Sequence, residues 1–323
     1  MEIIIPRHLN LMAPVNVSAT KNVDAQNTSP VMGEGLVRNP SLDVYQQSIQ
    51  FSSQLGLKID EPQFNKSAVS GNFNDVMEKA RSMMMAMKNS ADKYSQLPKK
   101  VEDGRGHISA AQNLIEEIHG DYQKKYGDIV IASTQYMQDV NTALGKMSAN
   151  VSAGKDGKIN FKPRDFLREL DSSMSKYTQY DHRISPFEAI EEASPGGYYQ
   201  SWSSSDSLTK PLATFDYTDA EFQFWEKKLS GQGFIVRENN GKIEICPDLK
   251  PVREIFKSVA NSSASWGGSD IMAQELQSLQ TAIDAQKNAV NNSVSRLLET
   301  FRQDNSHFET LVQLLIQLIK DLN

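Results

Sequence analysis

Apolar residues recur with alternating spacings of four and three along two long stretches of the chain. One stretch follows Ser109, a candidate helix N-cap, and the other follows Gly267-Gly268. This alternation is the seven-residue repeat of a coiled coil, whose narrow apolar seam faces a partner helix. The central seam residues are Tyr126, Val130, Met137, Val140 and Leu144 in the first stretch, and Val294, Leu297 and Phe301 in the second.

Each predicted seam needs a partner helix. No proline follows Pro251, so the last stretch is allowed to be one helix of roughly 50 residues, about 75 Å long. The economical arrangement packs a helix at 109–151 antiparallel on a helix at 271–322 within one molecule. An intermolecular coiled coil would satisfy the seams equally well. With their flanks, these segments are assigned as 101–151 and 267–323.

The region before the first long helix divides into two parts. Within residues 1–40, the stretch from Asn10 to about Pro40 is rich in Asn, Ser, Thr, Val and Pro without any period, and such a segment cannot bury enough apolar surface to offset its chain entropy. We expect it to be disordered. Residues 41–100 contain two shorter amphipathic stretches, 41–55 and 72–97, which predict a helical hairpin. Its methionines between Met83 and Met87 are typical of an adaptable apolar face or of ordinary core.

The segment between the two seams, 152–266, has a different character. It contains Pro, Gly and aromatic residues, and Asn239-Asn240-Gly241 is a strong signal for a tight hairpin turn. Strands are expected at 158–161, 233–238 and 242–246, and helices at 166–177, 220–229 and 251–259. The predicted fold class is therefore mainly α: a long antiparallel intramolecular coiled coil with an N-terminal helical hairpin and an inserted small mixed α/β domain.

Composition narrows the classes of function. The 323 residues are 39% hydrophobic and 23% charged, and 40 acidic residues against 34 Lys and Arg give a net charge of -6. Binding of nucleic acid through bulk positive charge is therefore not expected. No apolar run approaches the roughly 20 residues of a membrane span, so an integral membrane protein is not expected either.

Residues with the chemistry of catalysis or metal binding are sparse. The single Cys246 follows a strand-like IEI run and precedes Pro247, which favours a structural, half-buried thiol. The five histidines show no spacing of metal ligands, and Asp156-Gly157 is typical of a turn rather than of a calcium loop. His119 and Asp304 fall on or beside the seams, where a polar residue can set the register. We therefore expect no catalytic residue, no metal site and no cofactor.

Three motifs resemble one family. The last helix carries Asn305, Ser306, Phe308, Leu311, Val312 and Leu315 in the pattern NSxFxxLVxxL. The turn Gly154-Lys155-Asp156-Gly157 is similar to a GKDGN connection, and Leu249-x-Pro251-Val252 is similar to an LTP-type helix start. These features, and the chain order from about Ser109 to the end, resemble the type III secretion needle-tip proteins of the IpaD, SipD and BipD group.

The resemblance implies a protein exported through a type III apparatus from the bacterial cytoplasm to the needle tip at the cell surface. There it would cap the needle, regulate secretion and scaffold the translocator pore on contact with a host cell. Implied partners are the needle subunit, the translocators and further copies of the chain. Relatives with a hairpin like 41–100 are self-chaperoning and bind bile salts near it, so similar small amphiphiles are candidate ligands.

The C-terminal segment 305–323 has more apolar surface than a two-helix seam requires, which is typical of an interaction site. We expect the needle or a neighbouring protomer to bind there, through Asn305, Ser306, Phe308, Leu311, Val312, Leu315, Ile316 and Ile319. Burial of this surface by the hairpin or by the first long helix is an alternative for the free protein. Two other functions stay open: a secreted effector with an activity in 152–266, and a coiled-coil filament subunit.

Overall fold

The computed structural model describes residues 42, 44–54, 71–95, 106–117, 121–178 and 208–321. The predicted disordered segment 1–40 lies outside these ranges, as does the serine-rich segment 201–207. Within these ranges the α-helices before the first strand are α1 (Val44–Gln54), α2 (Phe73–Ser95), α3 (Gly106–Glu117) and α4 (Gln123–Gly145). A 3₁₀ turn, Lys146–Asn150, follows α4. The described part of the chain is mainly helical with two small antiparallel sheets, which confirms the coarse fold class.

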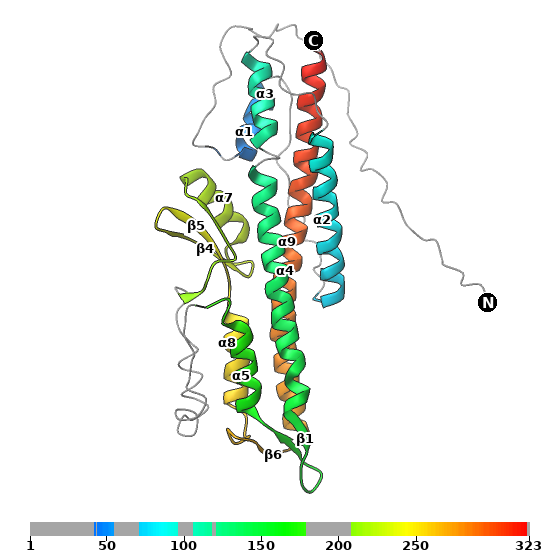
Figure 1. Cartoon of the computed structure of the whole chain (residues 1–323), viewed down its shortest axis with the longest axis vertical. Helices are drawn as coiled ribbons and strands as arrows, with labels where there is room; N and C mark the ends of the chain where they lie inside the picture. The colour runs from blue at the N-terminus through cyan, green and yellow to red at the C-terminus, as the bar shows by residue number, and fades with distance from the viewer. Residues whose placement is uncertain are drawn as a thin grey trace, which may run out of the picture. The chain divides into compact units, whose positions relative to one another are not determined.

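Helix α4 and the long helix α9 (Ala273–Asp321) run side by side in opposite directions (Figure 1). Near the start of α4, the Tyr126 hydroxyl donates to Oδ2 of Asp304 at 2.8 Å. Near its end, Nδ2 of Asn141 donates to Oδ1 of Asn291 at 2.8 Å. Residue numbers therefore rise along α4 as they fall along α9, and the pairing is intramolecular and antiparallel.

The two N-terminal helices have different neighbours. Helix α2 lies along α4 and α9, whereas α1 contacts α3 (Figure 1). The side chain of Gln138 reaches the sulfur of Met77 at 3.2 Å, and the methyl of Met87 lies over Gly127, so α2 runs antiparallel to α4. Val76, Ala80 and Met83 form its buried face because they recur every three to four residues. Helix α2 therefore packs on the two long helices α4 and α9.

The described part of the segment between the long helices contains two sheets and three α-helices. The sheet β3–β5–β4 joins β3 (Ala213–Asp216), β4 (Phe234–Asn239) and β5 (Lys242–Pro247). Asn240 and Gly241 connect β4 to β5 with φ angles of 53° and 73°, as expected for a two-residue turn that matches the twist of a hairpin. The helices are α5 (Pro163–Met174), α7 (Asp219–Leu229) and α8 (Lys250–Ala260). Helix α5 packs on α4, and α8 packs on α9 and on α5.

A second sheet forms where the long helices meet this segment. Its order is β1 (Val151–Ala153), β2 (Ile159–Phe161) and β6 (Ser269–Ile271), all antiparallel. The β1–β2 turn contains Asp156 and Gly157 at φ 53° and 72°. The sheet therefore includes residues on both sides of the predicted 152–266 segment, because β1 begins at Val151 and β6 follows Gly268.

Both ends of the predicted first long helix differ from the sequence-based expectation. Helix α3 begins at Gly106, so Ser109 lies inside a helix and does not cap it. Regular α-helix ends at Gly145 rather than at residue 151, because the chain tightens into the 3₁₀ turn before β1. The strands β1, β3 and β6 were not predicted, whereas the equally short β2 was expected at 158–161; runs of three or four residues give a weak alternating pattern.

Candidate interaction site on the C-terminal helix

The predicted partner-binding residues occupy different environments on α9. Asn305, Phe308 and Val312 are buried within the chain, Ile316 is partly buried against the core, and Ser306 is exposed. The side chains of Leu311, Leu315 and Ile319 lie outside the described residues. In this conformation the structure therefore brings Asn305, Phe308 and Val312 together in the interior, so their surface role stays a prediction.

The predicted seam residues are all buried at 6% exposure or less. Tyr126 of α4 stacks on Phe301 of α9, with ring centroids 4.0 Å apart. Such burial is what the alternating spacing predicts for side chains that face a partner helix.

One turn before Phe308, the carboxylate of Asp304 lies in the interior. Its side chain is 1% exposed, and its Oδ2 accepts hydrogen bonds from the hydroxyls of Tyr122 at 3.1 Å and Tyr126 at 2.8 Å. The ammonium group of Lys228, from α7, forms an ion pair with the same oxygen. Among the described residues, Oδ1 of Asp304 has no hydrogen-bond partner. Three elements of the chain therefore meet at a single carboxylate oxygen.

The two tyrosines remain hydroxyl donors. Burial raises the pKa of Tyr122 well above its ordinary value, and the charges of Tyr126 and Asp304 add to this effect. Burial raises the pKa of Tyr126 in the same way, with the nearby Asp304 carboxylate as the next cause. Neither phenol ionises in the neutral range, so both hydroxyls keep their protons and donate hydrogen bonds to Asp304.

Aromatic rings enclose this polar centre. Tyr122 stacks parallel to Trp225 with centroids 5.9 Å apart, and it contacts Phe308 at 4.4 Å. Trp225 is completely buried and also packs against Tyr126 and Phe224. We call this the Asp304 cluster, with the following members: Tyr122, Tyr126, Phe224, Trp225, Lys228, Phe301, Asp304 and Phe308.

A second polar contact lies on the next residue of α9. Oδ1 of Asn305 accepts a hydrogen bond from Nε2 of Gln123 at 2.9 Å. The same Nε2 is 3.4 Å from the Ser90 hydroxyl of α2. Helices α2, α4 and α9 are therefore linked through buried side chains beside the Asp304 cluster.

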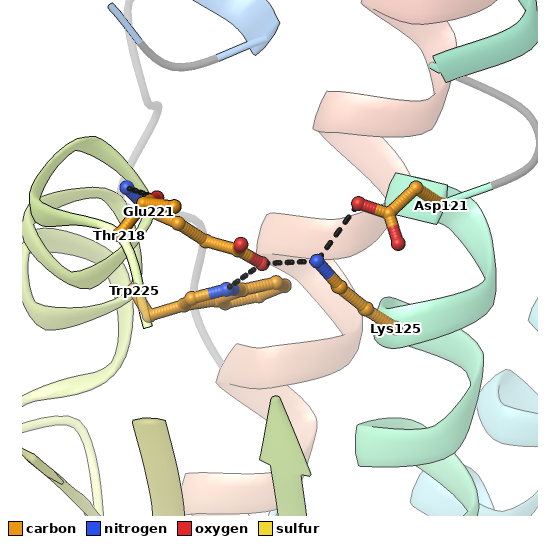
Figure 2. Close-up of polar contacts among 5 residues, drawn as sticks. All are labelled: Asp121, Lys125, Thr218, Glu221 and Trp225. Atoms are coloured by element: carbon orange, nitrogen blue, oxygen red, sulfur yellow. Dashed lines mark hydrogen bonds and ion pairs between the residues drawn. The ribbon is translucent and has the colours of Figure 1, made fainter. Parts of the chain in front are cut away.

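Helix α7 reaches α4 through a second ion pair (Figure 2). Thr218 caps α7, because its hydroxyl oxygen accepts a hydrogen bond from the Glu221 amide at 3.2 Å. Oε1 of Glu221 then accepts from Lys125 Nζ at 2.6 Å and from the Trp225 indole at 3.2 Å. Figure 2 shows the Lys125 ammonium between the carboxylates of Glu221 and Asp121.

The structure also shows the environment of the thiol and of the potential metal ligands. Cys246 is completely buried rather than half-buried, and burial raises the pKa of its thiol to about 11, which disfavours the reactive thiolate. Within the described ranges, no group of three His, Cys, Asp or Glu side chains could hold a metal ion. The described helices include none that is long and apolar enough to cross a bilayer.

Asp304 is recognisable in the sequence as a polar position beside the seam, but its contacts with Tyr122, Tyr126 and Lys228 are not. The acid on an apolar helix face was a usable signal that some cation must approach it. No local pattern indicates which lysine does so, since Lys228 lies 76 positions away in the sequence.

The sequence matches a known protein family over most of its length. The family of type III secretion systems tip complex components matches residues 53–321, from the end of α1 through α9. The chain belongs to this family. The description of the tip-complex family names parts of an assembly rather than an enzyme.

Curated relatives of the tip-complex family carry invasion-related names. The chain is 23% identical to the cell invasion protein SipD of Salmonella typhi over 71% of its own length and 62% of SipD. It is 22% identical to the invasin IpaD of Shigella flexneri over 83% of its length and 72% of IpaD. The alignment thus spans under two thirds of the Salmonella typhi relative.

A solved structure shares the fold. BipD, described as an invasion protein associated with the type-III secretion system of Burkholderia pseudomallei, superposes with a TM-score of 0.50 at 18% identity. The superposition covers 92% of this chain and 98% of BipD. At this identity the likeness concerns the fold alone.

Proposed function

We propose that the protein is a needle-tip component that caps the type III secretion needle, regulates secretion and scaffolds the translocator pore on contact with a host cell. The observation that carries the proposal is the match of residues 53–321 to the tip-complex family. The invasion-related names of SipD and IpaD support the same role. In this role the chain is exported through the apparatus and resides at the cell surface, with the needle subunit, the translocators and its own copies as partners.

The proposed docking element is the C-terminal part of α9, residues 305–319. Exposed Ser306 and partly buried Ile316 would contact the needle subunit or a neighbouring protomer directly. Buried Phe308 would fix the orientation of this helix from inside, through its ring contact with Tyr122. The antiparallel α4–α9 pair is then the coiled coil on which the tip assembles.

The proposed self-chaperone is the region 41–100, of which α2 provides the described cover. Its buried face, with Val76, Ala80 and Met83, lies along α4 and α9. Loss of α2 would leave apolar surface of the two long helices open to solvent, and such surface favours self-association. A bile salt or a similar amphiphile has the chemistry to bind the same apolar surface.

The docking proposal is tested with Ile316→Asp and Ile319→Asp in the secreting bacterium. A matched control is Gln313→Asp, because Gln313 is exposed on the same helix. We expect both isoleucine variants to be secreted but to be lost from needle tips in immunolabelling, with loss of translocator insertion into host membranes. The control should decorate needles normally. Needles decorated normally by both isoleucine variants would refute 305–319 as the docking element.

A further inference from the structure

Two ion pairs attach helix α7 to the two long helices. In one pair α7 supplies the positive charge, and in the other it supplies the negative charge. Lys228, in the last turn of α7, pairs with Asp304 of α9, and Glu221, in the first turn of α7, pairs with Lys125 of α4 at 2.6 Å. In each pair both side chains are largely buried, from 1% to 24% exposed. The two pairs hold opposite ends of α7 to different helices.

The Asp304 pair depends on α7 for its positive charge. The two tyrosines that donate to Asp304 are neutral, so Lys228 is the cation that the described structure places on this carboxylate. Removing one partner of a buried pair leaves an uncompensated charge in a poorly hydrated site, which is strongly destabilising. The docked position of α7 is therefore the one in which the α9 carboxylate is neutralised.

Between the two ion pairs the contact is aromatic. Trp225 of α7 lies against Tyr126 of α4 and against Tyr122, the residue just before α4, and Phe224 meets Tyr122 edge to face at 5.1 Å. Strand β3 adds Phe215, which stacks on Trp225 at 5.7 Å. Displacement of α7 would thus uncover apolar rings and the Asp304 carboxylate at the same place.

We propose that the crossed pairs Lys228–Asp304 and Lys125–Glu221 form a latch that holds α7 and the β3–β5–β4 sheet on the α4–α9 pair. Opening the latch releases this module as a unit while the long helices stay paired. The released surface is an acidic aromatic patch on α4 and α9, formed by Tyr122, Tyr126, Phe301 and Asp304. The latch consists of contacts within the chain and does not rest on the tip role.

The test uses full-length protein with Lys228→Met, Asp304→Asn and the double variant. Methionine keeps most of the apolar stem of lysine and removes only its charge. Lys242→Met is the matched control, because Lys242 pairs with Asp216 on an exposed part of the same module. Hydrogen exchange is followed separately for residues 213–247 and for α4 and α9, and acrylamide quenching of Trp225 is measured in a Trp202→Phe, Trp266→Phe background.

Both single variants should exchange amides of 213–247 about a hundredfold faster, because a buried charge has lost its partner. Quenching of Trp225 should rise with it, while α4 and α9 keep their protection and the Lys242 control matches the parent protein. The double variant should exchange more slowly than either single variant, since it buries no unpaired charge.

Three results would overturn the latch. The first is unchanged exchange of 213–247 in both single variants. The second is equal acceleration in the module and in the long helices, which would mean that the module does not release by itself. The third is a double variant whose effect is the sum of the two single effects.

Discussion

Asn141 of α4 donates a hydrogen bond to Asn291 of α9 across the helix pair, from Nδ2 to Oδ1 at 2.8 Å. Asn291 in turn donates to the carbonyl oxygen of Gly71, just before α2, at 2.9 Å. Asn291 is 1% exposed, so this pair places a buried polar layer where apolar side chains otherwise meet. One amide therefore links three segments of the chain.

Replacing only one member of this layer should destabilise the protein. We expect Asn291→Leu to lower the free energy of unfolding by about 1–3 kcal/mol, because the Gly71 carbonyl loses the Asn291 donor and the Asn141 amide keeps only its hydrogen bond to the Met137 carbonyl. Urea denaturation followed by circular dichroism measures the change. The double variant Asn141→Leu, Asn291→Leu should recover part of the loss. If the double variant lost the sum of both single effects, the hydrogen bond between the two amides would carry no stability.

Two glycines with positive φ differ in how closely other atoms approach them, so their substitution distinguishes the cost of backbone strain from the cost of a steric clash. Gly241, at φ 73°, has no atom within 4 Å of where a Cβ would lie, whereas at Gly233, φ 99°, that Cβ would lie 2.0 Å from the Ser293 hydroxyl of α9. We expect Gly241→Ala to cost about 1–2 kcal/mol from conformational strain alone. Gly233→Ala should cost clearly more in the same denaturation measurement.

Adding Ser293→Gly to the Gly233→Ala variant removes the steric conflict but leaves the strain. We expect the stability of this double variant to rise towards that of Gly241→Ala. If the double variant were no more stable than Gly233→Ala alone, the contact with Ser293 would not be the cause of the extra destabilisation.

Cys246 should react slowly with thiol reagents in the native protein. Its side chain is buried and the pKa of its thiol is raised to about 11, so the thiolate fraction at pH 8 falls about a hundredfold below that of an ordinary cysteine. Labelling with Ellman's reagent at pH 8 should be slow for the native protein in buffer. It should be fast for the protein unfolded in about 6 M guanidinium. Equal rates in both conditions would contradict the buried position.

Acid should remove a contribution that Asp139 makes to stability. Partial burial alone would raise the pKa of this carboxyl, but hydrogen bonds from Tyr177, Lys176 and Gln135 outweigh that effect, and the pKa is lowered. A lowered folded-state pKa gives stability that is present above the unfolded-state value, about 4, and is lost as the pH falls through the folded-state value.

Asp139→Asn should therefore be less stable than the parent protein at pH 7, and the difference should shrink below about pH 4. Urea titrations at pH 7 and at pH 3 measure both quantities, with Asp284→Asn, an exposed position of α9, as the control. A difference that stays constant between the two pH values would contradict ionic stabilisation by Asp139.

Local patterns were sufficient for most of the secondary structure. The heptad spacing predicted the paths of α4 and α9, and Asn239-Asn240-Gly241 predicted the β4–β5 turn, because both signals lie within a few consecutive residues. The three-residue strand β2 was expected from the strand-like run 158–161, whereas β1 and β6, of the same length, were missed. Each of these two strands pairs with β2 across the sheet, and that pairing cannot be counted along the chain. Helix α3 begins at Gly106, three residues before the N-cap that Ser109 predicts.

The sequence by itself determined which residues are helical, which helix faces are apolar and which family the chain resembles. Only the tertiary structure decided that Asp304 meets Lys228 and two tyrosines, that α2 lies on the long helices while α1 contacts α3, and that Phe308 faces inward. Periodicity is a property of neighbouring residues and can be counted along the chain. The partner of a buried charge or ring is selected by the packing of segments far apart in sequence, where burial and compensation of charge together determine the arrangement.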